Sequence, residues 1–144
     1  MKHIERHYST QSPAQLFDLV ADVERYPDFL PLVVSAKVFR KKENVVWTDL
    51  TMGTSLLQKQ FTTIARLDRP RRIVVSSHDP AFERFEQVWT FSPSPKGGTD
   101  VEYQVELLLR SRVLQILIAA PFANQANTMV KAYIREARRL YGSA

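Results

Sequence analysis

The chain has 144 residues, 44% apolar and 24% charged, which is ordinary for one globular domain with a sizeable core. It contains no cysteine, which excludes disulfide bonds, thiolate nucleophiles and cysteine-ligated metal centres. The formal net charge of +5 suits contact with an anionic membrane surface or with RNA, and equally a plain solvated surface.

No stretch of the sequence is typical of a membrane span or of a signal peptide. The longest apolar segment, 113–123, contains Gln115 and Pro121 and is about half as long as the ~18 residues expected of a span. The first ten residues alternate charged and apolar side chains and lack an apolar signal core. We therefore expect a soluble, cytoplasmic protein, and peripheral contact with the inner membrane stays open as an alternative.

The N-terminal region is expected to form a strand at 2–9 and a helix at 13–22. Ser12 followed by Pro13, with Gln15 three residues after the serine, is typical of a helix N-cap that closes a capping box. The apolar residues that follow are spaced for one face of a helix. The sequence therefore predicts a short amphipathic helix directly after the first strand.

A second short helix is expected at 23–30. Tyr26 and Phe29 are three residues apart and share one face of such a helix, and Pro27 is tolerated in its first turn. As core residues the two rings would anchor the helix on a sheet, and as a lid they would close an apolar space. The sequence alone leaves both interpretations open.

Residues 32–110 are rich in Val, Ile, Thr, Phe and Trp, in runs that turn residues separate. The segment Lys96-Gly97-Gly98-Thr99 is typical of a hairpin, because glycine adopts positive φ without strain. Short connections between consecutive strands indicate antiparallel pairing. We expect six strands here, at 32–41, 44–54, 58–68, 71–78, 83–92 and 99–110.

Alternation within these strands predicts a sheet that is covered on one side only. One face collects the apolar residues and a few polar ones. Its members are Phe61, Thr63, Ala65 and Leu67, then Ile73, Val75 and Ser77, then Phe85, Gln87, Trp89 and Phe91, then Val101, Tyr103, Val105, Leu107 and Leu109.

The cover for this face is expected from a long helix at 112–141, which Pro121 should bend or break. Gly142 stands where a C-terminal cap is expected. The predicted fold class is α+β: a curved antiparallel sheet of about six or seven strands around a long C-terminal helix, with two short helices after the first strand. We expect a single domain over residues 1–144.

Few residues of the sequence point to catalysis or metal binding. His3 and His7 share one face of the expected first strand, but about 13 Å of strand separates them, too far for one metal ion. We interpret them, with isolated His78, as surface residues. No phosphate loop, dinucleotide fingerprint, nucleophile elbow or H-E-x-x-H motif occurs.

Asp22, Glu24 and Asp28 lie within seven residues and have two interpretations. They can form an acid–base pair, or they can simply mark the end of one helix and the start of the next. We favour the second interpretation, because nothing in the sequence places a partner group beside them.

The order of elements and a set of short motifs resemble the START-like helix-grip superfamily. Within it, the chain is most similar to the coenzyme Q-binding, polyketide cyclase/dehydrase-like group. The resemblance covers nearly the whole chain, and its motifs are modest individually but specific in their order and spacing. They are Ser12-Pro13, Leu19 to Val23, Tyr26 to Pro31, Ser35, Val38, Phe85, Trp89-Thr90-Phe91, Val101-Glu102-Tyr103, Leu114-Gln115, Pro121-Phe122, Ala126-Asn127 and Met129 to Tyr133.

The resemblance implies a deep apolar tunnel between the sheet and the long helix, and a non-enzymatic protein that binds ubiquinone or a similar isoprenoid lipid. The lipid tail would lie along Phe61, Trp89, Phe122, Ala126, Met129, Val130 and Tyr133. A lid at the tunnel mouth would consist of Tyr26, Pro27, Phe29, Leu30 and Pro31. A filled core fits the same helical stripe of apolar residues equally well. No covalent or metal cofactor and no DNA partner are expected.

Two alternatives remain within the resemblance. Members of a sister group are ribosome-associating toxins, and the basic charge of this chain suits a ribosomal partner. A polyketide aromatase/cyclase would need a polar acid–base group in the tunnel, for which Gln87, Tyr103 and Tyr133 are the candidates. In addition, Leu32-Val33 follow the second proline where close relatives commonly carry Trp-Cys or Gly-Cys, which keeps the site apolar but removes an aromatic ring.

Overall fold

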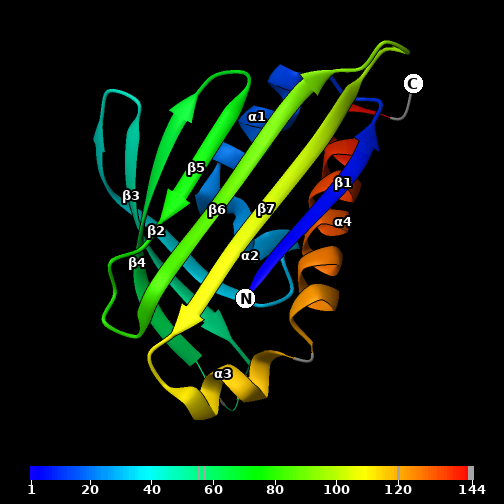
Figure 1. Cartoon of the computed structure of the whole chain (residues 1–144). Helices are drawn as coiled ribbons and strands as arrows, with labels where there is room; N and C mark the ends of the chain where they lie inside the picture. The colour runs from blue at the N-terminus through cyan, green and yellow to red at the C-terminus, as the bar shows by residue number, and fades with distance from the viewer. Residues whose placement is uncertain (55, 57, 120, 143–144) are drawn as a thin grey trace.

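The structure, a computed structural model, describes residues 1–54, 56, 58–119 and 121–142. A curved sheet of seven antiparallel strands wraps around one long helix (Figure 1). The elements in chain order are β1 (Lys2–Ser9), α1 (Pro13–Ala21), a single 3₁₀ turn η1 (Val23–Arg25), α2 (Tyr26–Phe29), β2 (Val33–Lys42), β3 (Val45–Gly53), β4 (Gln58–Asp68), β5 (Arg72–Ser76), β6 (Phe82–Pro93), β7 (Thr99–Leu109), α3 (Arg112–Ala119) and α4 (Phe122–Tyr141).

The predicted α+β fold with its antiparallel sheet is confirmed. The strand order is β1-β7-β6-β5-β4-β3-β2, so only the pairing of β1 with β7 joins strands that are distant in sequence. The predicted capping box of α1 is present in both halves, at 3.2 Å from the Gln15 N–H to the Ser12 hydroxyl and at 3.0 Å from the Ser12 N–H to the Gln15 side chain. The second predicted helix is shorter than expected and splits into η1 and α2.

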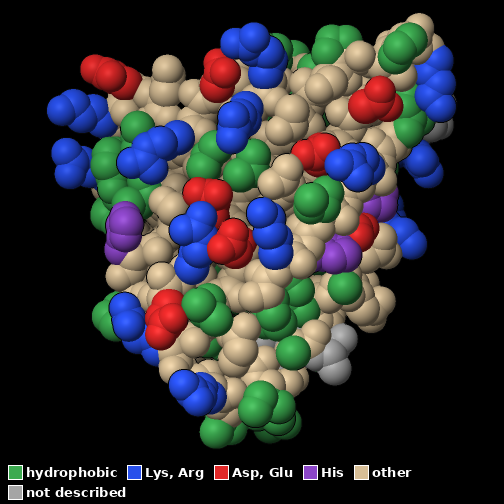
Figure 2. All heavy atoms as spheres, in the orientation of Figure 1, with side chains coloured by type: hydrophobic (Ala, Val, Ile, Leu, Met, Phe, Trp, Pro, Cys, Tyr) green, Lys and Arg blue, Asp and Glu red, His purple; other side chains and the backbone are tan. Residues whose placement is uncertain are grey.

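The concave face of the sheet carries the alternating residues that the sequence places on one side. Trp89 of β6 lies opposite Tyr103 of β7, with 4.6 Å between ring centroids, and Phe91 lies opposite Val101. All four side chains are buried. Helices α1 and α4 pack on this face, while the convex face, which mixes acidic and basic side chains, meets solvent (Figures 1 and 2).

The C-terminal helical segment is divided at Pro121, as predicted, but only its second part covers the sheet. Pro121 has no N–H to continue a helix from α3, and it forms the N-cap of α4, where its carbonyl accepts the first helical hydrogen bond from Gln125. Residue 120 of the predicted helix lies outside the described residues. Helix α3 lies across the open end of the sheet instead (Figure 1). Within the described ranges, no helix is both long and apolar enough to cross a bilayer.

His3 and His7 are only partly exposed, whereas the prediction placed them on the surface. They point inward from β1, and their Nε2 atoms lie 2.5 Å and 3.0 Å from the two oxygens of Glu5. The amide of Asn127 in α4 donates to Glu5 at 2.5 Å. Burial raises the pKa of the Glu5 carboxyl, but the hydrogen bonds from Asn127 and both histidines outweigh it and lower that pKa to about 2. A half-buried carboxylate therefore links β1 to α4.

We expect the Glu5→Gln variant to lose roughly 1–2 kcal/mol of unfolding free energy near neutral pH, since the amide keeps the shape but not the charge. The folded-state pKa of Glu5 is depressed from 4.5 to about 2, so its contribution is complete above pH 4.5 and is lost as the pH falls toward 2. Urea unfolding at several pH values measures this. The exposed Glu83→Gln variant is the control, and a Glu5→Gln deficit that persists unchanged at acid pH contradicts the assignment.

Candidate ligand-binding site

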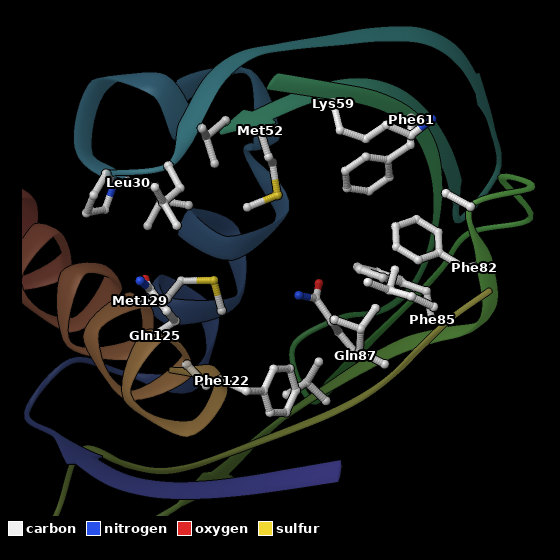
Figure 3. A pocket seen from close by; sticks show the side chains of 18 of the residues that line it. Leu30, Met52, Lys59, Phe61, Phe82, Phe85, Gln87, Phe122, Gln125 and Met129 are labelled. Atoms are coloured by element: carbon white, nitrogen blue, oxygen red, sulfur yellow. The ribbon is translucent and has the colours of Figure 1, made fainter. Parts of the chain in front are cut away.

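A cavity of about 510 Å³ lies between the concave face of the sheet and α4. Figure 3 shows Phe61 of β4 with Phe82 and Phe85 of β6 on one side, and Phe122 and Met129 of α4 on the other. The volume falls within the range of about 300–1,000 Å³ typical of small-molecule sites. The sheet curves away from the helix here, and the side chains that line this space do not fill it.

Three phenyl rings form the wall of the cavity on the sheet side. The ring centroids of Phe61 and Phe82 are 5.2 Å apart, those of Phe61 and Phe85 are 5.7 Å apart, and those of Phe82 and Phe85 are 5.0 Å apart. Edge and tilted contacts of this kind fix each ring against its neighbours. The wall is therefore preformed and apolar, which suits a hydrocarbon ligand.

The cavity has a buried inner end and an exposed mouth. Buried lining residues are Leu30, Val33, Phe61, Tyr103, Val105 and Ala126. Exposed lining residues are Pro31, Gln58, Lys59, Leu114, Gln125 and Thr128. The exposed set comes from the start of β4, from α3, from the first turns of α4 and from the segment after α2. A ligand can therefore enter at the end of the molecule where α3 lies.

One polar pair lies inside the otherwise apolar cavity. The side-chain amide of Gln87 projects into it (Figure 3), and its Nε2 donates to the Tyr103 hydroxyl at 2.8 Å. Burial raises the pKa of Tyr103 well above its ordinary value, so this hydroxyl stays neutral. No donor within the described part of the chain reaches the carbonyl oxygen of Gln87. That oxygen can accept a hydrogen bond from a ligand.

Four of the seven residues predicted along a lipid tail line the cavity, namely Phe61, Phe122, Ala126 and Met129. The other three, Trp89, Val130 and Tyr133, lie in the packed core instead. Trp89 is enclosed between Tyr103 and Tyr133, with 4.9 Å between the ring centroids of Trp89 and Tyr133. These three side chains therefore shape the cavity from behind and do not meet its contents.

The predicted lid divides in the same way. Leu30 and Pro31 line the cavity, but Tyr26, Pro27 and Phe29 do not. The rings of Tyr26 and Phe29 pack on Tyr133 of α4 at centroid distances of 5.4 Å and 5.5 Å, and the Tyr26 hydroxyl donates to the Val20 carbonyl. The two aromatics are thus anchors of α2 in the core.

A salt-bridge cluster holds the preceding turn to the same helix. Glu136 of α4 is buried and contacts Arg25 of η1 at 2.6 Å and Arg139 at 2.7 Å. The hydrogen bond from Arg139 lowers the pKa of Glu136, burial opposes it, and with the bond from Arg25 the pKa falls to about 2. The segment from η1 to α2 is therefore fixed, and only Leu30 and Pro31 at its end reach the cavity.

The sequence did not single out several residues that line the cavity. Phe85 and Gln87 were placed on the correct face of the sheet, but Phe82 and Met52 were not associated with a site. The strand pattern of β6 continues to Phe82, which lies opposite Leu109 at the end of the sheet. Strict alternation from Phe85 would turn Phe82 to the other face of the sheet, and the irregularity in the β6–β7 pairing between Phe82 and Arg84 brings it to the cavity side.

The titratable side chains that line the cavity are Lys59 at its mouth and Tyr103 inside it. No Asp, Glu or His lines the cavity, and no cluster of three potential metal ligands occurs in the part of the chain that the structure describes. Asp22 caps α1, and the carboxylate of Glu24 accepts the Val38 N–H at 2.9 Å. Asp22 and Glu24 therefore have structural roles, as the favoured interpretation of the sequence stated, and Asp28 lies in the first turn of α2.

Residues 10–133 match the family described as polyketide cyclase / dehydrase and lipid transport. The chain belongs to this family. Of the curated proteins, the ribosome association toxin RatA of Pseudomonas aeruginosa is 30% identical over 141 residues, which cover 97% of this chain and 98% of that protein. The mitochondrial coenzyme Q-binding protein COQ10 homolog B of Xenopus laevis is 28% identical over 89% of this chain and 54% of that protein.

Comparison with solved structures shows that this chain has the START-like fold. A START superfamily protein from Mycobacterium smegmatis superposes with a TM-score of 0.82 at 14% identity, covering 96% of this chain and 98% of that one. The Zhui aromatase/cyclase from a Streptomyces species superposes with a TM-score of 0.83 at 13% identity, covering 100% and 98%. At these identities the likeness concerns the fold alone, and it confirms the predicted helix-grip architecture.

Proposed function

We propose that this protein is a non-enzymatic carrier or chaperone for ubiquinone or a similar isoprenoid lipid, and that it supports respiratory electron transport. The observation that carries the proposal is the 510 Å³ apolar cavity with one polar pair, Gln87 and Tyr103, inside it. Burial of a hydrocarbon contributes about 0.8 kcal/mol for each methylene group, so such a cavity binds an isoprenoid without many hydrogen bonds. The relative named as a coenzyme Q-binding protein supports the choice of ligand.

The volume of the cavity limits how much of such a ligand it can enclose. At about 30 Å³ per water-sized group, 510 Å³ holds roughly 17 such groups. That is enough for a substituted quinone ring and the beginning of its chain. The ring would lie at the inner end beside Gln87, and the remainder of a long tail would leave through the mouth.

The purified protein is expected to carry a stoichiometric isoprenoid quinone after expression in a quinone-rich host. Organic extraction followed by mass spectrometry measures it, with the variant Ala126→Phe purified in parallel as a cavity-blocked control. A quinone in the wild type and none in the variant is the expected result. Equal amounts in both, or no lipid in either, would contradict the proposal.

Ribosome association is the second candidate, because the relative with 30% identity over 97% of this chain is named as a ribosome association toxin. The short basic groups Arg40-Lys41-Lys42 and Arg71-Arg72 lie on β2 and at the start of β5, and their side chains are exposed. Cosedimentation with ribosomal subunits that weakens as salt rises would favour this candidate. It does not require the cavity, and this difference separates the two functions.

A further inference from the structure

Helix α3 shows its apolar side to solvent and its polar side to the protein. Val113, Ile116 and Leu117 are 68%, 74% and 66% exposed. These three positions fall within about 100° of arc on a helix of 3.6 residues per turn. Gln115 faces the opposite way, and its side-chain oxygen accepts the Leu109 N–H at 2.9 Å. An amphipathic helix on a free-standing globular protein has the reverse arrangement.

The same end of the molecule carries a further exposed apolar side chain, outside α3. Leu56, between β3 and β4, is 94% exposed. The flanking residues Met52 and Gln58 line the cavity, and so does Leu114 of α3, which is both exposed and part of the lining. Figure 2 shows hydrophobic side chains gathered at this lower end, where Figure 1 places α3. The exposed apolar side chains therefore border the mouth of the cavity.

The charge around these side chains is positive. The sequence has no acidic residue between Glu106 and Glu136, and none between Asp49 and Asp68. Arg110 precedes α3 and Arg112 is its first residue; both are exposed and form no ion pair within the described residues. Asp79, between β5 and β6, contacts Lys59 at 3.4 Å. Cations beside an apolar helix face suit an anionic lipid headgroup layer.

We propose that α3 and Leu56 form a membrane-docking edge that inserts into an anionic lipid bilayer and joins the cavity mouth to the lipid phase. Val113, Ile116 and Leu117 enter the acyl boundary, and Arg110 and Arg112 contact the headgroups. Leu114, on the inner flank of the helix, then forms a continuous apolar path from bilayer to cavity. The apolar path rests on the proposed carrier function, because it serves a lipid tail that is too long for the cavity and leaves at this mouth. Membrane docking does not depend on that function.

Sedimentation with vesicles tests the proposal directly. Wild-type protein is expected to bind vesicles of phosphatidylcholine mixed with phosphatidylglycerol and to bind phosphatidylcholine alone more weakly. Ile116→Ser with Leu117→Ser should weaken binding to the mixed vesicles about tenfold or more, because two exposed apolar side chains are lost. Arg110→Gln and Arg112→Gln should each weaken it about fivefold, with less effect at high salt.

Phe39→Ser is the matched control, because Phe39 is a comparably exposed apolar residue, 52% exposed, on β2. It should bind vesicles like the wild type. Because the chain contains no cysteine, an environment-sensitive dye can be attached to Leu117→Cys alone, with Phe39→Cys as its control. A blue shift on vesicle addition at position 117 and none at 39 is expected. Equal shifts, or none at 117, overturn insertion.

Other occupants of this edge give different results. If α3 joins two copies of the chain, light scattering will show a dimer that the Ile116→Ser, Leu117→Ser variant abolishes. If it binds the ribosome, the same variant will lose cosedimentation with subunits. Either result without vesicle binding overturns the proposal. If extraction finds no quinone but the protein binds vesicles, membrane docking is supported and the carrier function is contradicted. If extraction finds quinone but the protein does not bind vesicles, the carrier function is supported and membrane docking is overturned.

Discussion

Ala126→Phe should abolish quinone binding without destabilising the fold, which is the largest effect that the structure predicts. Ala126 is buried on α4 and its side chain lines the cavity. A phenyl group there occupies the space where the ligand would lie, between Phe122 and the sheet. We expect the affinity for a short-chain quinone to fall about 100-fold or more, because most of the apolar contact is lost.

The same variant should unfold at an unchanged or slightly higher temperature. Adding a large side chain to a packed core costs about 1–3 kcal/mol, whereas an empty apolar cavity loses about 24 cal/mol per Å³ that a side chain could fill. Ala123→Phe is the matched control, because Ala123 is exposed on α4, one turn earlier than Ala126. Quinone titration and thermal unfolding are measured on both variants.

Two results would contradict this prediction. If Ala126→Phe lowers the melting temperature by many degrees, the space is a packed core and not a ligand cavity. If it binds quinone like the wild type, the ligand lies elsewhere. Ribosome cosedimentation of the same variant distinguishes the two candidate functions. Ribosome association through the basic surface should be unaffected when the cavity is blocked, whereas a carrier function should be lost.

Most of the fold could be predicted because local signals agreed with each other. Ser12, Pro13 and Gln15 specify the start of α1, period-two alternation identifies the concave face of the sheet, and Pro121 separates α3 from α4. The direction of α3 could not be predicted in this way. Its apolar spacing is the same whether it covers the sheet or faces outward, and only the position of Gln115 against β7 reveals which occurs.

The candidate site was predicted less completely, for a geometric reason. A helical stripe such as Phe122, Ala126, Met129, Val130 and Tyr133 does not distinguish residues at a cavity from those one-third of a turn away in the core. The orientation of α4 against the curved sheet determines which residues reach the cavity, and Val130 and Tyr133 lie in the core. The same reason applies to the histidines. Strand alternation predicts that His3 and His7 share one face of β1, but it does not predict that α4 packs on that face.

The polar pair inside the cavity is expected to select ligands by their head and not by their chain. Gln87→Leu should weaken binding of a short-chain quinol about 10- to 100-fold, because the ligand hydroxyl loses its acceptor in an apolar site. Affinity for a linear isoprenoid hydrocarbon should stay the same or rise, since leucine keeps the volume and removes a polar group. Gln60→Leu, exposed on β4 and outside the cavity lining, is the matched control and should change neither affinity.

The pair should also bind both redox forms of a quinone. With Gln87 donating to Tyr103, its carbonyl oxygen accepts from a quinol hydroxyl. Rotation of the amide lets Tyr103 donate to that oxygen and turns the Nε2 donor toward a quinone carbonyl. Wild-type affinities for quinone and quinol should therefore agree within about tenfold, and Tyr103→Phe should weaken both.

In a double-mutant cycle the Gln87→Leu and Tyr103→Phe effects should be non-additive, because they remove the same hydrogen bond. Additive effects, or a Gln87→Leu variant that binds quinol normally, would place the head group away from this pair.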